Sequence, residues 1–495
     1  MNEQKKFDKR VRKQTKIVAT VAHKINTELI EDLYFNGVDV FRLNTAHMTV
    51  EDAKPFIKKI RSVSEKIAIL IDTKGPEIRT INITENLNLE QGQIITLSGG
   101  DCINTKDHLC VDFENIINVV EPGKNILIDD GEIELKVIEK LEFSLRCEVL
   151  VGGVVKNRKS LNIPNVNIDL PSLTEKDRRF IEFSAKEGID FIAHSFVRNK
   201  NDVLEVQKIL DKYNSPIKII AKIENQEGVD NIDEILDNVY GIMVARGDLG
   251  IEIPAGEVPG VQKYLINRCV EKRKRVIVAT QMLQTMIEHP FPTRAEVSDV
   301  ANAIFDGADA VMLSGETAYG KYPIKAVQTM VEIAQTVDEQ TAGFMDSSIK
   351  EIIADPVASY LAQAAVRSTL ELPITAIVCD TLTGRTSRYL SAFKGHVPIF
   401  TICYDKQTMR ELALCYGVQP FYLNRQESIE QFLEDTMGLL YNKHIFDENL
   451  IAVVAGNFGP NHGASFLEIS KVKNFKDMRA KRNKLKSVSE DKELD

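Results

Sequence analysis

The chain has 495 residues, of which 43% are hydrophobic and 27% charged, and a formal net charge of −10 at pH 7, a length that favours two or three domains over one compact core. The acidity argues against a nucleic-acid binder, although a locally basic pocket could still hold phosphates. No run of 18 apolar residues and no apolar N-terminal signal segment occurs, so we expect no membrane span and a cytoplasmic location.

Eight short apolar runs rich in Val, Ile and Phe recur along the chain, with helical spacing between most of them. Continuous rather than alternating hydrophobicity is typical of parallel strands that are covered on both faces. We therefore expect a βα unit repeated eight times, as in a (β/α)8 TIM barrel, an α/β fold whose active sites lie at the C-terminal ends of the strands. The predicted strands are Lys16–Ala22, Val38–Leu43, Lys66–Ile71, Phe191–Val197, Ile217–Ile223, Tyr240–Ala245, Arg275–Thr280 and Ala308–Leu313.

The connection after the third predicted strand is much longer than the others. Between Gly75 and about Leu173, Gly, Asn and Asp punctuate short alternating segments such as 132–137. Turn signals at this spacing predict a small all-β barrel domain over residues 76–172, inserted into a catalytic barrel formed by residues 1–75 and 173–345. An insertion on the catalytic face could act as a lid that excludes water.

Beyond Thr341 the pattern remains α/β but changes register. A predicted helix and three apolar strands indicate a separate open-sheet α/β domain over residues 346–475: Val357–Leu370, Ile374–Cys379, Ile399–Tyr404 and Leu450–Ala455. Residues 476–495 are strongly charged, so we expect a solvated tail.

Seven cysteines are scattered through the chain with no C-x-x-C pair. This spacing suggests neither a disulfide framework nor a zinc site. We therefore expect reduced, structural thiols.

Polar side chains follow seven consecutive predicted strands. Any one of them could simply cap a helix or form an ion pair, but together they predict the convergent polar ring of a barrel active site. The set comprises Arg42, Asn44, Asp72, Thr73, Lys74, Ser195, Lys222, Glu224, Asp248, Thr280, Ser314 and Glu316.

Glu224 and Asp248 are hard oxygen ligands with no His or Cys beside them, which favours Mg²⁺ or Mn²⁺ over zinc. Lys222 either pairs with Glu224 or stabilises an oxyanion or a transferring phosphoryl group. Gly247 would let backbone amides approach a bound carboxylate closely.

Long strings in a fixed order carry a resemblance to a known family. They include Thr15–Thr20, Asp72–Arg79, Lys222–Gly228, Met243–Gly250, Ala279–Leu283 and Met312–Glu316. Over essentially its full length the chain resembles pyruvate kinases, whose inserted and C-terminal domains it also matches. The resemblance implies an enzyme of glycolysis that transfers a phosphoryl group from phosphoenolpyruvate to ADP, giving pyruvate and ATP, and that assembles as a cytoplasmic homotetramer.

The resemblance also implies roles for individual residues. Lys222 would stabilise the transferring phosphoryl group and the developing enolate, and Arg42 would contact phosphate. Gly247, Asp248 and Thr280 would bind the substrate carboxylate, and Thr280 could join a proton relay. Glu224 and Asp248 would hold Mg²⁺, while a second Mg²⁺ travels with the nucleotide. The residues assigned to the nucleotide are Asn44, His47, Arg79 and Lys159.

The chain departs from the family pattern at the monovalent-cation site. Asn44, Asp72 and Thr73 would bind K⁺, but Ala46 stands where the family usually has a serine. Glu77 accompanies K⁺ dependence in this family, so we expect K⁺ activation with weakened affinity. We interpret His194, where a small residue is common, as structural.

The C-terminal domain carries a possible effector site. Thr381, Thr383, Gly384, Arg385 and Thr386 open a predicted helix and resemble the loop that holds a phosphate of fructose 1,6-bisphosphate in allosteric members. Simple helix capping is the alternative, and the partner loop, residues 459–465, matches the family poorly. An anionic sugar-phosphate effector, and with it a regulatory role for this domain, is therefore an expectation whose identity stays open.

Two other functions are compatible with parts of this pattern. A non-catalytic paralogue acting as a scaffold or sensor would be favoured by the loss of Arg42, Lys222, Glu224, Asp248 or Thr280, yet all five are present. A Mg²⁺-dependent barrel aldolase or lyase would lack the two added domains. A nucleotide requirement would separate that class from a kinase.

Overall fold

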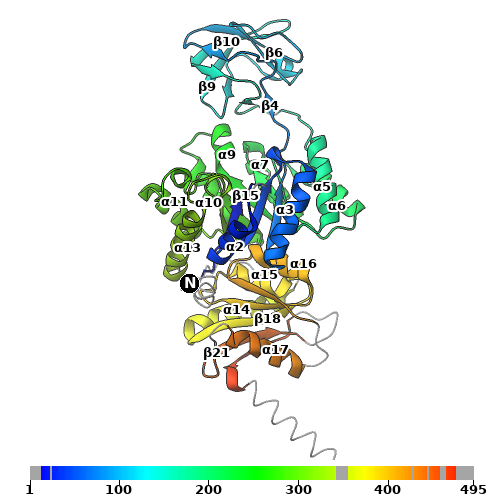
Figure 1. Ribbon diagram of the computed structural model, residues 1–495, viewed down its shortest axis with the longest axis vertical. Helices are drawn as coiled ribbons and strands as arrows, with labels where there is room; N and C mark the ends of the chain where they lie inside the picture. The colour runs from blue at the N-terminus through cyan, green and yellow to red at the C-terminus, as the bar shows by residue number, and fades with distance from the viewer. Residues whose placement is uncertain are drawn as a thin grey trace, which may run out of the picture.

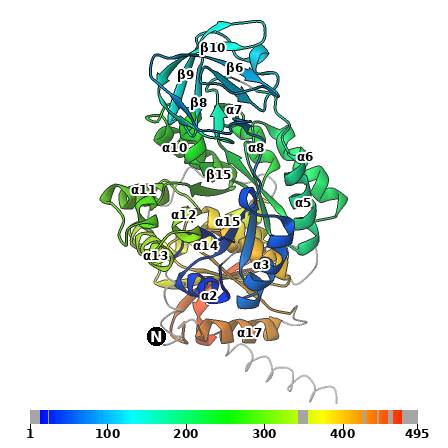
Figure 2. The same cartoon turned by 45° about the horizontal axis from the view of Figure 1, so that its top comes forward.

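The computed structural model describes residues 13–22, 25–166, 168–341, 355–424, 429–442, 445–456 and 464–474. Three bodies are stacked along its long axis (Figure 1). A β-rich insertion stands at one end, a barrel in the middle and an α/β domain at the other end, and the view in Figure 2 keeps the same order. In the described residues no helix is both long and apolar enough to cross a bilayer.

The middle body is a closed barrel of eight parallel strands, which confirms the predicted (β/α)8 fold. Each predicted apolar run overlaps one strand. Around the barrel the order is β1-β17-β16-β15-β14-β13-β3-β2. The bounds are β1 Lys16–Thr20, β2 Val40–Asn44, β3 Ala68–Asp72, β13 Phe191–His194, β14 Lys218–Ile223, β15 Gly241–Ala245, β16 Arg275–Ala279 and β17 Ala310–Leu313.

Helices surround the barrel, and several begin with strong local signals. α3, α5 and α11 each start with a reciprocal capping box, for example Thr174 with Asp177 in α5. The elements are α2 Thr27–Asn36, η1 Thr45–His47, α3 Val50–Val63, α5 Glu175–Glu187, α6 Lys200–Lys212, α7 Gln226–Asp230, α8 Ile232–Asn238, α9 Arg246–Glu252, α10 Val258–Lys272, η2 Gln284–Ile287, α11 Arg294–Phe305, α12 Gly315–Ala318 and α13 Pro323–Gln340.

Barrel strands are buried on both faces. Alternate residues such as Val40, Leu70 and Phe191 fill the interior, while Phe41 and Ile69 belong to the larger core under the helices. This two-sided burial is the reason that the strands read as continuous apolar runs.

The insertion has its own apolar core and a largely antiparallel architecture. Seven strands form a sheet in the order β4-β12-β8-β9-β10-β6-β7, and β5 pairs with β11. The bounds are β4 Ile78–Arg79, β5 Leu87–Leu89, β6 Ile94–Gly99, β7 His108–Val111, β8 Asn125–Ile128, β9 Ile133–Lys140, β10 Leu145–Val151, β11 Gly153–Val155 and β12 Ser160–Asn162, with one short helix, α4 Ile116–Val119.

The expectation that all cysteines are reduced was wrong for one pair. Cys102 and Cys110 form a disulfide, while the other five thiols are free and buried. No spacing motif in the sequence predicts this bond. The two cysteines meet because the backbone between β6 and β7 turns back on itself, as the bridge between Thr105 and His108 shows.

The C-terminal body is an open five-stranded sheet in the order β20-β19-β18-β21-β22. Its three predicted strands are present, whereas β20 and the antiparallel β22 were not anticipated. The bounds are α14 Pro356–Glu371, β18 Ile374–Thr381, α15 Arg385–Ala392, β19 Ile399–Cys403, α16 Lys406–Glu411, η3 Leu412–Leu414, β20 Val418–Tyr422, α17 Ile429–Tyr441, β21 Leu450–Ala455 and β22 Phe466–Lys471. The tail 476–495 and most of the loop 459–465 lie outside the described residues.

Candidate active site

Lys222 is the centre of a buried charge cluster at the C-terminal end of the barrel. Its Nζ lies 2.9 Å from Glu224 Oε1 and 3.2 Å from Asp72 Oδ1, and it donates a 2.7 Å hydrogen bond to Ser195 Oγ. The predicted pairing with Glu224 is therefore present, and a second carboxylate shares the same cation.

Strand register brings the remaining charges to this cluster. β2 and β3 pair so that Asn44 stands opposite Asp72, and Asp72 in turn stands opposite Ala193 of β13. Arg42 Nε donates to Asp72 Oδ2 at 2.6 Å and Nη1 donates to Thr20 Oγ1 at 2.9 Å. Arg42, Asp72, Lys222 and Glu224 thus form one continuous chain of alternating charges.

Burial and charge act in opposite directions on these groups. Burial alone would lower the pKa of Lys222, but the carboxylates of Asp72 and Glu224 raise it above its usual value. Burial opposes the ionisation of Asp72 too, yet Arg42 and Lys222 lower its pKa on balance. Lys222 is a cation at every physiological pH, and Asp72 an anion.

The two carboxylates predicted to bind metal behave differently. Burial raises the pKa of Glu224 to about 7, and the nearby charge of Asp248 adds to that effect. The pKa of Asp248 is likewise raised by burial. A site that crowds two buried carboxyls with one lysine is short of positive charge, which a divalent cation would supply.

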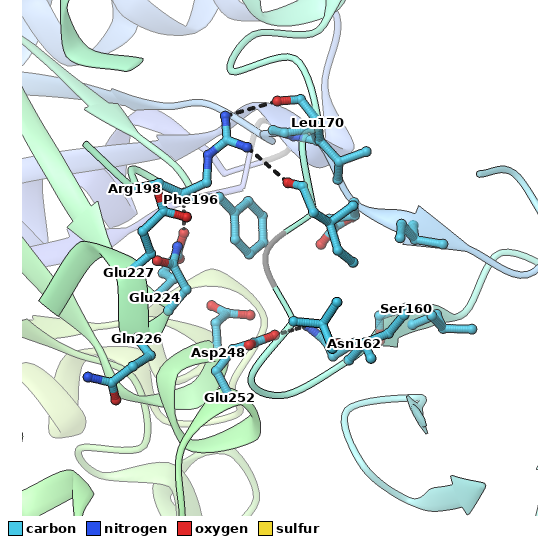
Figure 3. A pocket seen from close by; sticks show the side chains of 18 of the residues that line it. Ser160, Asn162, Leu170, Phe196, Arg198, Glu224, Gln226, Glu227, Asp248 and Glu252 are labelled. Carbon is cyan, nitrogen blue, oxygen red and sulfur yellow. Dashed lines mark hydrogen bonds between the residues drawn. The ribbon is translucent and has the colours of Figure 1, made fainter. Parts of the chain in front are cut away.

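The donor set fits a hard cation. Glu224 Oε2 accepts a hydrogen bond from Phe196 N at 2.7 Å, whereas Oε1, although ion-paired with Lys222, accepts no hydrogen bond among the described residues. Asp248 lies in the first turn of α9 and faces the same cleft (Figure 3). Two carboxylates with open positions between them match the preference of Mg²⁺ for few protein ligands.

Thr280 and Gly247 meet beside this cluster. Gly247 N donates to Thr280 Oγ1 at 2.7 Å, and that hydroxyl donates to Ala279 O at 2.7 Å. Thr280 and Gln281 both have positive φ, 67° and 53°, a backbone state that is uncommon for non-glycine residues. Arg246, to which sequence reasoning gave no role, holds this turn by donating to Thr280 O at 2.8 Å.

A cleft separates the barrel mouth from the insertion (Figure 3). Phe196, Glu224 and Asp248 line it from the barrel, and Ser160 and Asn162 line it from the insertion. Asn162 Nδ2 reaches across to Glu252 Oε1 at 3.2 Å. The insertion therefore stands over the carboxylate pair, where a lid would be expected.

Two of the predicted nucleotide residues lie on the insertion side. Pairing of β4 with β12 places Arg79 opposite Ser160, next to Lys159. Arg79 is ion-paired with Glu77, and Lys159 Nζ lies 2.7 Å from Asp129 Oδ1. Both cations are partly exposed, so an anionic ligand could compete for them.

The other two predicted nucleotide residues lie at the barrel mouth. Asn44 Oδ1 accepts from Ala46 N at 3.0 Å and so caps η1. The side chain of His47 lies outside the described residues.

The residues predicted to bind K⁺ come together at the same mouth. Thr73 Oγ1 accepts from Ser195 N at 3.0 Å, and Thr45, which sequence reasoning left aside, donates its hydroxyl to Asp72 O at 2.8 Å. The Ala46 carbonyl accepts from Lys176 Nζ at 3.2 Å. Hydroxyl and carbonyl oxygens are thus concentrated beside Asn44.

The predicted effector residues lie far from this site, in the C-terminal domain. Thr381 ends β18, and Gly384, with φ of 75°, precedes α15. Arg385 pairs with Asp355 at 3.4 Å. Thr383 O accepts from Arg388 Nη1 at 2.9 Å, so part of the loop already has partners within the chain.

Comparisons with known proteins agree with this architecture. The family model described as "Pyruvate kinase, barrel domain" matches residues 12–327, and that described as "Pyruvate kinase, alpha/beta domain" matches residues 359–470. The chain is 44% identical over 475 residues to a pyruvate kinase of Borreliella burgdorferi. That alignment covers 93% of this chain and 98% of the relative. A pyruvate kinase of Staphylococcus aureus (strain MRSA252) is 42% identical over 454 residues, covering 90% and 78% respectively.

Proposed function

The chain belongs to the pyruvate kinase family and transfers a phosphoryl group from phosphoenolpyruvate to ADP in glycolysis, and we propose that the Lys222 cluster is its reaction centre. The single observation that carries this assignment is the burial of Lys222 between Asp72 and Glu224 at the mouth of the barrel. Counting Asp248, the cluster holds more carboxylates than cations, so a divalent cation at Glu224 and Asp248 would have to join Lys222 and Arg42 before the site could hold the substrate phosphate.

The family depends on metal ions, and the metal we propose here is Mg²⁺, or Mn²⁺, held by Glu224 and Asp248. When bound, it would supply positive charge to substrate oxygens as negative charge builds up on the enolate. Lys222 lies between Glu224 and Asp72, and its ammonium would face the transferring phosphoryl group. Because it is held by ion pairs before substrate arrives, little reorganisation is needed during transfer.

Arg42, fixed by Asp72 and Thr20, would contact the phosphate together with Lys222. Phosphoryl transfer needs positioning and charge neutralisation more than covalent catalysis. The Arg42 guanidinium and the Lys222 ammonium would meet that requirement if both contacted the substrate phosphate.

The Thr280 turn would bind the substrate carboxylate. Gly247 and Asp248 lie in the first turn of α9, and the Gly247 amide donates to the Thr280 hydroxyl. That hydroxyl donates to Ala279 O and could instead donate to the substrate, which makes it a candidate proton donor for conversion of the enolate to pyruvate.

The insertion would contribute to nucleotide binding. Arg79 and Lys159 would exchange their partners Glu77 and Asp129 for nucleotide phosphates, with Asn44 and His47 contributing from the barrel. K⁺ would bind at Asn44, Asp72 and Thr73. Assembly as a cytoplasmic homotetramer, and binding of an anionic sugar phosphate at the 381–386 loop, are further parts of the proposal.

A coupled assay of ADP-dependent pyruvate formation with the full chain tests the reaction centre. Lys222→Met should lower kcat at least about a thousandfold, on the scale of removing a transition-state cation in phosphoryl transfer. Lys218→Met, at the opposite end of β14 and paired with Glu411, is the matched control and should retain activity. Full activity in Lys222→Met would refute the assignment.

A further inference from the structure

The Cys102–Cys110 disulfide is a feature of the insertion that the proposed reaction does not use. Cys110 is fully buried in β7, whereas Cys102 is partly exposed. The five remaining thiols are all buried. A dissolved thiol could therefore reach the disulfide through Cys102, while the other cysteines are shielded.

The loop closed by this disulfide binds residues 81 and 82, which follow β4 within the insertion. Ile81 N donates to Cys110 O at 3.0 Å, and Asn104 Nδ2 donates to Ile81 O at 2.7 Å. Cys110 N completes the connection by donating to Asn104 Oδ1 at 2.9 Å. Asn82 Nδ2 lies 3.3 Å from Cys102 O. Both cysteines thus contact residues 81 and 82 through their own backbones.

Arg79 ends β4, two residues before Ile81, and its backbone also bonds to the chain that follows Cys110. Asp112 N donates to Arg79 O at 3.0 Å, and Arg79 N donates to Asp112 Oδ1 at 2.7 Å. Asp112 follows Cys110 by two residues. A conformational change in the disulfide loop would therefore be transmitted to the backbone of Arg79 through these two hydrogen bonds with Asp112.

His108 provides a base beside the sulfurs. A ring nitrogen of His108 and the two Sγ atoms lie within 4.8 Å of one another, and Thr96 Oγ1 lies 2.6 Å from His108 Nδ1, which orients the ring. Burial lowers the pKa of His108, so the imidazole is neutral near pH 7 and able to exchange protons with a thiol.

We propose that Cys102–Cys110 is a reversible redox site that adjusts nucleotide binding through Arg79. The effect on the nucleotide rests on the role proposed for Arg79, whereas the thiol chemistry does not. The co-reactant is a dithiol reductant.

Two successive thiol–disulfide exchanges reduce the Cys102–Cys110 bond. A thiolate of the dithiol attacks Cys102 Sγ, forming a mixed disulfide and releasing the Cys110 thiolate, which takes a proton through His108 or water. The second thiol of the reductant then attacks the mixed disulfide and releases the Cys102 thiol. In sum, the dithiol loses two electrons and two protons and becomes a disulfide, and the protein gains two thiols.

Redox titration of the full chain tests the chemistry. The protein is equilibrated in buffers of reduced and oxidised dithiothreitol containing EDTA, trapped with iodoacetamide and analysed by peptide mass spectrometry. We expect Cys102 and Cys110 to become alkylated together as the buffer becomes reducing, and to return to the disulfide on reoxidation. Cys147 in β10 is the internal control, because burial raises the pKa of its thiol to about 12 and keeps it unreactive.

Two results would overturn the redox assignment. One is a pair that stays alkylatable in fully oxidised buffer. The other is a pair shielded without EDTA and exposed by EDTA alone, which would mean that Cys102, His108 and Cys110 hold a soft metal ion instead.

Steady-state kinetics test the connection to Arg79. Reduction should raise the KM for ADP about threefold or more while leaving the KM for phosphoenolpyruvate unchanged, because ground-state contacts to the nucleotide are loosened. The double variant Cys102→Ser/Cys110→Ser should behave as the reduced protein in either buffer, and Cys147→Ser should respond as the wild type does. Equal KM values for ADP in both redox states would refute the connection, and the alkylation result does not depend on catalysis.

Discussion

His194 offers a direct test of how burial controls charge in the barrel wall. The residue ends β13 with its side chain fully buried, and neither ring nitrogen has a hydrogen-bond partner among the described residues. Burial lowers the pKa of His194 to about 4, against the attraction of Asp202 and Asp177. The imidazole is therefore neutral in the folded protein near pH 7.

The size of the effect follows from proton linkage. The unfolded chain binds a proton at His194 near pH 6.5, and the folded chain does so only near pH 4, so unfolding takes up a proton between these values. The contribution of neutral His194 to the free energy of unfolding is fully present above about pH 6.5 and is lost as the pH falls toward about 4. The total loss is roughly 3 kcal/mol, of which about 2 kcal/mol has occurred at pH 5.

Hydrogen exchange of barrel peptides, followed by mass spectrometry from pH 7.5 to pH 5, can measure this loss as a local opening free energy. His194→Leu removes the titrating group, so its barrel should lose about 2 kcal/mol less than the wild type over that interval. His289→Leu, at an exposed position, is the matched control and should keep the wild-type pH dependence. The same slope in His194→Leu and wild type would refute the argument.

Three further predictions concern catalysis. Glu224→Gln removes a metal carboxylate and should raise the Mg²⁺ concentration for half-maximal activity at least about tenfold; an unchanged Mg²⁺ titration would contradict the metal assignment. Activity should be higher in K⁺ than in Na⁺ or tetramethylammonium, and Ala46→Ser should lower the K⁺ concentration needed; equal rates in all three salts would exclude a K⁺ site. Arg79→Ala should raise the KM for ADP while the KM for phosphoenolpyruvate stays near the wild-type value, and the reverse pattern would remove Arg79 from the nucleotide site.

Local pattern was enough to predict most of the architecture. The barrel strands are buried on both faces, so their apolar runs could be read without knowing their neighbours. β22 was missed because most of its side chains are partly exposed, which leaves no continuous apolar run. β20 was missed because Pro420 and partly exposed residues interrupt it.

Much of the candidate site could be predicted for a similar reason. Parallel strands place their carboxyl ends at one rim, so polar residues at strand ends such as Lys222, Glu224 and Thr280 had to converge. The family resemblance then supplied roles that spacing alone could not assign.

Tertiary structure alone decided the pairings within that rim and beyond it. Asp72 shares Lys222 with Glu224 because β13 pairs with both β3 and β14, although about 150 residues separate Asp72 from Lys222 in the chain. Cys102 meets Cys110, and Arg79 comes beside Lys159, through contacts that no periodicity encodes. Hydrophobic pattern reports whether a residue is buried, which is a local property, whereas the identity of its partner depends on how distant segments pack.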